Sequence, residues 1–143
     1  MGKRYLTDTN IVRKYLDEEL SVRGLELIDS ILDNSESNIS VITRIELLGF
    51  SPDREELLRF IVQFIGYSFE YNLSEDIIQK TIEIRKSIKI RLPDAIIAAT
   101  ALCNNLILLS DNDSDFDKIP NLRYINPRKY WWCNTYGATN PIL

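Results

Sequence analysis

The chain has 143 residues, ordinary proportions of apolar and charged side chains and a formal net charge of −4, which suits one globular domain that buries about two-thirds of its unfolded surface. The net charge argues against nonspecific coating of nucleic acid but allows a locally acidic metal site. The sequence contains no histidine, which excludes histidine-based triads, histidine-ligated zinc and histidine nucleases. No glycine-rich nucleotide loop is present either. Chemistry at charged groups must therefore depend on Asp, Glu, Lys, Arg and Tyr.

The location of the protein follows from two further absences. No apolar run approaches the roughly 20 residues that span a bilayer. The N-terminus also lacks the apolar core of a signal peptide. We therefore expect a cytoplasmic protein with no membrane association.

The N-terminal stretch predicts a buried strand that leads directly into a helix. The apolar run at 4–7 stops at Asp8, and apolar residues with helical spacing follow over about 10–18. Asp8 is therefore expected at the carboxyl end of a strand, where open α/β sheets bind ligands, most often where the winding reverses. Asp8 can equally cap the helix, although Thr9 or Asn10 could serve as the cap instead.

Helices and short strands alternate along the rest of the chain, which predicts an α/β domain with a parallel sheet of about five strands. A polar, acid-rich loop or short turn is expected at 110–117. The periodicity predicts helices at 21–32, 42–48, 53–66, 74–90 and 92–103, and strands at 39–41, 67–71, 106–109 and 122–125.

Two predictions concern burial. In the helix at 42–48 we expect Ile42, Ile45 and Leu48 to face inward, with Leu47 as a further candidate and the carboxylate of Glu46 wedged beside them. Cys103 follows the apolar pattern of the preceding helix and is expected in the core. Both this cysteine and Cys133 are expected to be reduced, because they form no metal-type pair.

Acidic side chains follow the predicted strands at four places. Asp8 ends the first strand, Glu46 lies about one turn into the helix after the second, and Asp94 opens the most apolar helix. An acid-rich cluster at 111–115 follows the fourth strand. Converging carboxylates without histidine favour a hard divalent cation such as Mg²⁺ or Mn²⁺, acting on phosphate esters.

Each acidic group also has a structural interpretation. Asp94 in a first helical turn complements the helix dipole, Glu46 could lie on the surface, and the cluster at 111–115 could be a solvated turn.

Four stretches taken together resemble a PIN-domain ribonuclease, and in particular the VapC toxins of toxin–antitoxin pairs. The resemblance spans about residues 4–127 and is most specific around Asp94. The stretches are YLTDTNI at 5–11, ITRIEL at 42–47, LPDAIIAATA at 92–101 and LLSDNDSDF at 108–116.

The resemblance implies a three-layer α/β/α domain over 1–127 and magnesium-dependent endonucleolytic cleavage of RNA, with Mn²⁺ able to replace Mg²⁺. By similarity, Asp8, Glu46 and Asp94 are the acidic triad and the metal ligands. The fourth position of the family falls on Asn112, with Ser110 supplying a hydroxyl where relatives carry threonine.

A further acidic position of the family, which is more variable, falls on Asp115. The neutral Asn112 leaves room for one tightly held metal ion. Asp111, Asp113 or Asp115 could compensate, and the choice among them stays open.

The resemblance also implies an RNA substrate, a cognate small antitoxin with a basic tail, and a homodimer. The apolar faces of the helices at 53–66 and 74–90 offer more surface than one small sheet needs, which favours the dimer as well. Two alternatives remain open at this point. One is a DNA-directed nuclease of the same fold, and the other is a non-enzymatic module that binds RNA or protein.

The segment 128–143 extends beyond the resemblance. It contains Tyr130, Trp131 and Trp132. These aromatic residues are expected either to pack this tail onto the domain or to contribute to a partner interface.

Overall fold

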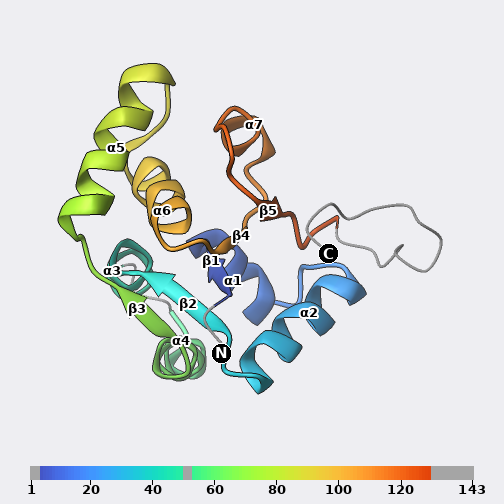
Figure 1. Ribbon diagram of the computed structural model, residues 1–143. Helices are drawn as coiled ribbons and strands as arrows, with labels where there is room; N and C mark the ends of the chain where they lie inside the picture. The colour runs from blue at the N-terminus through green and yellow to red at the C-terminus, as the bar shows by residue number, and fades with distance from the viewer. Residues whose placement is uncertain (1–3, 50–52, 130–143) are drawn as a thin grey trace.

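The computed structural model describes residues 4–49 and 53–129, so the predictions for Tyr130, Trp131, Trp132 and Cys133 lie outside the described residues. Five parallel strands form one sheet in the order β3-β2-β1-β4-β5 (Figure 1). The strands are β1 (Tyr5–Thr7), β2 (Ser37–Ser40), β3 (Phe69–Tyr71), β4 (Ile107–Leu109) and β5 (Tyr124–Ile125).

Helices connect successive strands, as parallel pairing requires. In the described residues they are α1 (Thr9–Leu16), α2 (Val22–Asp33), α3 (Val41–Gly49), α4 (Glu55–Gly66), α5 (Glu75–Ser87), α6 (Leu92–Cys103) and the short α7 (Asp113–Phe116). None of these helices is long and apolar enough to cross a membrane.

Each face of the sheet packs against its own apolar core. Tyr5 and Leu6, neighbours on β1, point to opposite faces because side chains alternate along a strand. The first core also contains buried residues of α1, α2, α3 and α4. The second contains buried residues of α5, α6 and α7. The predicted three-layer α/β domain with about five parallel strands is therefore confirmed.

The winding of the sheet reverses between its two central strands. The chain proceeds outward from β1 through β2 to β3 and then returns to place β4 on the other side of β1. The backbone N–H of Asp8 extends this pairing by donating to the carbonyl of Leu109 over 2.9 Å. Asp8 and Ser110 therefore follow the two strands that flank the switch point, where open α/β sheets form their ligand crevice.

The second strand begins two residues earlier than predicted. Ser37 and Asn38 look like turn residues, yet both are buried and pair with β1. The Asn38 amide donates to the carbonyl of Tyr5 over 2.8 Å, which supplies a partner for a polar side chain inside the sheet. Val41, predicted in the strand, opens α3 instead.

The prediction for the buried face of α3 was right for Leu47 and wrong for Ile45 and Leu48. Ile45 is 60% exposed and Leu48 is 42% exposed, whereas Thr43 and Leu47 are buried. The hydroxyl of Thr43 lies 3.1 Å from that of Thr9 on α1, so a polar contact between helices helps to set the rotation of α3.

Cys103 is exposed rather than buried. It is the last residue of α6, and burial along this helix is continuous from Asp94 to Ala101. The thiol lies 3.5 Å from the carbonyl of Asp76. The helix therefore leaves the core in its last turn, although the apolar pattern continues through it.

Candidate active site

Asp8 lies at the centre of the candidate site and is also the N-cap of α1. It follows β1 in extended conformation, and one carboxylate oxygen accepts from the backbone N–H of Thr9 over 2.8 Å. The other oxygen accepts from the hydroxyl of Ser110 over 2.9 Å. The capping and the site interpretations are therefore compatible, because the cap fixes a carboxylate that is only 5% exposed.

Glu46 reaches the same edge of the sheet from α3. One of its carboxylate oxygens accepts from the hydroxyl of Thr9 over 2.6 Å. The guanidinium of Arg13 donates to the Glu46 carbonyl over 3.2 Å, which ties α1 to α3 at this point. Thr9 therefore connects the Asp8 cap to the Glu46 carboxylate.

Asp94 lies in the first turn of α6, a position that the preceding Pro93 favours. Its side chain is only 8% exposed and accepts from Nε of Arg91 over 3.2 Å. The Arg91 side chain is itself 72% exposed. A buried carboxylate is therefore balanced by a cation that extends from the surface.

The charges of Asp8, Glu46 and Asp94 act on the same neighbouring groups. Burial is the main factor that raises the pKa of Asp8, to about 6, and the nearby charges of Asp94 and Glu46 add to it. The hydrogen bonds from Ser110 and Thr9 oppose the shift. The pKa of Arg91 is raised chiefly by its hydrogen bond and ion pair with Asp94, with smaller contributions from the other two acids.

The loop after β4 places its polar residues in different surroundings. Ser110 is completely buried and contacts Asp8, and its oxygen also accepts from the backbone N–H of Asn112 over 3.1 Å. The Asn112 amide donates to Asp115 over 3.0 Å, and its oxygen accepts from Ser114. Asn112 and Asp115 therefore bind one another at the start of α7.

The remaining acids of this loop are held by cations. Asp111 forms ion pairs with Lys14 and with Arg128. Asp113 pairs with Lys129 over 2.9 Å. Burial raises the pKa of Asp113, but hydrogen bonds from Lys129 and neighbouring polar side chains outweigh it and leave the pKa below its ordinary value.

The chemistry of the donor set fits a hard cation. Across 4–49 and 53–129, no three acidic or cysteine side chains lie close enough together to form a complete metal site on their own. Mg²⁺ needs only one or two protein carboxylates, since it keeps several waters and takes further ligands from phosphate groups. Asp8 and Asp94, both buried and mutually repelling, supply such a pair.

Sequence reasoning missed three residues that organise these acids. Thr9 and Thr43 form the hydroxyl bridge between α1 and α3, and Arg91 pairs with Asp94. The position of Arg91 three residues before Asp94 in a helical start is a detectable signal. The contact between Thr9 and Thr43 joins residues 34 apart, for which the sequence offers no local signal.

The raised pKa of Asp8 predicts how the stability of the metal-free protein depends on pH. The native state retains a proton from the ordinary value of 3.8 up to about pH 6, whereas the unfolded chain releases it. The free energy of unfolding should therefore fall as pH rises through this window. Asp8→Asn removes the buried charge and should stabilise the protein above about pH 6 by up to about 3 kcal/mol, with little gain below about pH 4.

Urea unfolding in EDTA across this pH range measures the difference between the variant and the parent chain. Asp53→Asn, at an exposed carboxylate, is the control and should leave the pH dependence unchanged. If Asp8→Asn raised the free energy of unfolding equally at both ends of this pH range, the electrostatic explanation would be contradicted.

A family model and several solved structures match this chain. The model of the PIN domain matches residues 5–122. A toxin–antitoxin complex from Klebsiella pneumoniae contains a chain with 28% identity and a TM-score of 0.65, covering 86% of this chain and 97% of that one. VapBC-1 from nontypeable Haemophilus influenzae shows 25% identity and a TM-score of 0.69, covering 87% and 98%.

A third structure, VapBC2 from Rickettsia felis bound to a DNA fragment from its promoter, shows the same fold at 24% identity. Its TM-score is 0.72, and the match covers 85% of this chain and 97% of that one. No curated protein matches the chain. The family model covers most of the chain, and the acids that carry the sequence resemblance lie at the switch point of the matching fold; the chain therefore belongs to the PIN-domain family, and within it resembles the VapC type.

Proposed function

We propose that this chain is a Mg²⁺-dependent endoribonuclease and the toxin of a toxin–antitoxin pair. The observation that carries the proposal is the burial of Asp8 and Asp94 at the switch point, close enough for each charge to influence the other. Membership of the PIN domain, a family of nucleases, supports phosphodiester hydrolysis. The similar chains in toxin–antitoxin complexes support the toxin role.

In this mechanism Asp8 and Asp94 would hold Mg²⁺, and Glu46 would hold a second ion or orient the attacking water. When bound, the ion would supply a Lewis acid that activates water and offsets negative charge on the phosphate. Ser110 keeps the Asp8 carboxylate in one orientation, and the Thr9 hydroxyl does the same for Glu46. Asn112 and Asp115 complete the polar wall at the start of α7.

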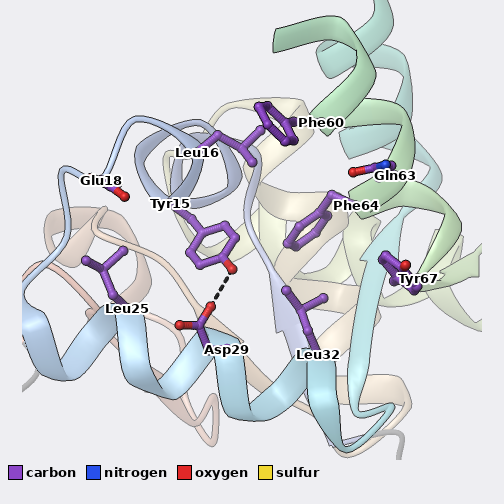
Figure 2. A pocket seen from close by; sticks show the side chains of 10 residues that line it. All are labelled: Tyr15, Leu16, Glu18, Leu25, Asp29, Leu32, Phe60, Gln63, Phe64 and Tyr67. Carbon is purple, nitrogen blue, oxygen red and sulfur yellow. Dashed lines mark hydrogen bonds between the residues drawn. The ribbon is translucent and has the colours of Figure 1, made fainter. Parts of the chain in front are cut away.

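The proposed inhibitor is a small partner with an amphipathic helix and a basic tail. An apolar groove of about 460 Å³ lies between α1, α2 and α4 (Figure 2). Its lining includes Leu25 and Leu32 on one side and Phe60 and Phe64 on the other, with Tyr15 donating to Asp29 across the floor. Such a groove suits the apolar face of a helix.

The basic tail of the partner would extend from this groove to the acids. Tyr15 lines the groove and Asp8 caps the same helix, so the two sites lie about 10 Å apart along α1, at 1.5 Å per residue. Arginine is the best side chain for the acidic end, because its planar group binds carboxylates in two places and stays charged.

A homodimer completes the proposal. On α4, Ile61 and Phe64 are already buried in the first core. On α5, Ile78 and Ile82 share a face, four residues apart, and are 38% and 43% exposed. The exposed face of α5 is the candidate that we choose for a symmetric contact between two copies.

The nuclease mechanism predicts that Asp94→Asn reduces RNA cleavage by at least about 100-fold, because it removes a charged ligand where transition-state charge develops. Cleavage of single-stranded RNA in Mg²⁺ by the purified protein is the measurement. Asp76→Asn is the matched control, since Asp76 is also a first-turn acid but lies on α5. Full cleavage in excess EDTA, or cleavage of single-stranded DNA only, would overturn the proposal.

The inhibitor model predicts that changes at either end of the docking path weaken partner binding. Phe60→Asp in the groove should lower the affinity about 30-fold or more, as expected for an aromatic anchor, and Asp94→Asn should lower it by removing the acceptor of the basic tail. Val62→Asp is the control, because Val62 is 54% exposed on the same helix but does not line the groove. Calorimetry at rising Mg²⁺ concentration should also show weaker binding of the partner. A partner affinity that changes neither with Mg²⁺ nor with Asp94→Asn would contradict the model.

The dimer predicts a change in mass when the α5 face is disrupted. The protein should sediment as a dimer at roughly tens of micromolar, and Ile82→Arg should give a monomer because it places a charge in an apolar contact. Val62→Arg, which introduces the same charge on α4, should remain dimeric. A parent chain that sediments only as a monomer would refute the assembly.

A further inference from the structure

The last turn of α5 and the connection to α6 carry a cluster of positive charge that forms no ion pair among the described residues. Within 4–49 and 53–129, nine lysine and arginine side chains form ion pairs. Three more bind a ring, a side-chain amide or a carbonyl group. Four have no such partner in the described residues, and three of them, Arg85, Lys86 and Lys89, fall within five consecutive residues. We call these three side chains the basic loop.

The backbone of the basic loop is anchored to the second core. Ile84 and Ile90 are each 6% exposed, and Ile88 packs partly against the same core. Arg85, Lys86 and Lys89 lie between these anchors and are all exposed. The segment 85–90 also lines a shallow hollow of about 360 Å³. The chain therefore presents three cations from a fixed frame around a concave surface.

The helix dipole explains only part of this arrangement. Arg85 and Lys86 lie in the last turn of α5, where positive charge complements the helix C-terminus. Lys89 lies beyond the helix, after the C-cap at Ile88, and gains nothing from the dipole. Because the chain carries a net charge of −4, an unneutralised cluster here is a local exception to the charge of the whole molecule.

The basic loop leads directly to the acidic site. Lys89 lies two residues before Arg91, so their backbones are at most about 7 Å apart. Arg91 contacts Asp94, and its pKa is also raised by Glu46 and Asp8. Figure 1 shows α5 and α6 side by side, so this connection lies at one end of a tightly packed helix pair. A polyanion that reaches the acids can therefore contact the basic loop at the same time.

We propose that the basic loop is a phosphate-binding surface for single-stranded RNA, which holds the strand a few nucleotides from the bond that is cleaved. This inference rests on the proposed function for its substrate. Carboxylates alone repel a phosphodiester chain, so the RNA needs cations outside the acidic site. Arg85, Lys86 and Lys89 supply them without breaking an ion pair, and they read the strand by charge rather than by sequence.

Binding of a labelled oligouridylate of ~12 nucleotides, a length typical of single-strand sites, tests the proposal in EDTA, where cleavage is absent. The triple variant Arg85→Gln, Lys86→Gln, Lys89→Gln should bind at least about tenfold more weakly at low salt. The slope of log affinity against log salt should become shallower by about 2, since each lost single-strand phosphate contact contributes about 0.7. Lys89→Gln alone, which leaves α5 unchanged, should give about one-third of that change in slope.

The matched control is Arg23→Gln, Arg54→Gln, Arg59→Gln, which removes the same charge from exposed positions on α2, at the N-cap of α4 and on α4. The control should keep the parental affinity and slope. An equal loss of RNA affinity in both triple variants would show that the effect comes from net charge. An RNA affinity and salt slope that the basic-loop substitutions leave unchanged would show that the loop does not bind RNA. Either result overturns the proposal. Displacement of the RNA by polyglutamate at equal charge concentration would assign the loop to acidic peptides and overturn it as well.

Cleavage assays separate this proposal from the nuclease mechanism. If both hold, the basic-loop variant raises KM for RNA and leaves kcat at saturation within about twofold, because uniform binding is lost. If the parent chain binds RNA through the basic loop but cleaves none in Mg²⁺, the nuclease mechanism fails while the binding surface stands. A fall in kcat with unchanged KM would place the loop in the chemistry instead and overturn the binding role.

Discussion

The parallel pairing of β1 with β4 is the contact on which the rest of the structure depends. It joins Tyr5 to Ile107 and Leu6 to Leu108, bringing together segments about 100 residues apart in the chain. The same pairing creates the switch point and sets Asp8 beside Ser110. Because both strands are buried on both faces, a slip by one residue would move each side chain into the opposite core and misplace the acids.

The second organising constraint is electrostatic. Asp8, Glu46 and Asp94 converge where burial already disfavours charge, and the raised pKa of Asp8 records that cost. Buried carboxylates that repel one another cost stability, and a site with such perturbed pKa values is a candidate functional site. Arg91 offsets part of the repulsion from the solvent side, because its side chain is 72% exposed and pairs with Asp94.

Around the acidic site, charges of opposite sign lie on different segments. The acids after β4 are largely held by Lys14, Arg128 and Lys129, while the basic loop has no acidic partner among the described residues. An acidic site and an adjacent basic surface would suit two different ligands. In the two proposals, the basic tail of an inhibitor would bind the acidic site and the phosphate backbone of a substrate would bind the basic surface, so the two ligands would compete only at the acids.

The sequence by itself determined the parallel sheet of about five strands and the placement of Asp8 and Asp94, because these follow from apolar runs and from which residue ends each element. The three layers were implied by the resemblance to PIN domains. It could not determine the rotation of α3, where Ile45 is exposed and Thr43 buried, because periodicity cannot tell which neighbour covers a helix. Ion pairs posed the same difficulty, since Lys14 and Asp111 lie 97 residues apart. The basic loop emerged only from the tertiary structure, because a cation is uncompensated only when the folded chain brings no carboxylate to it.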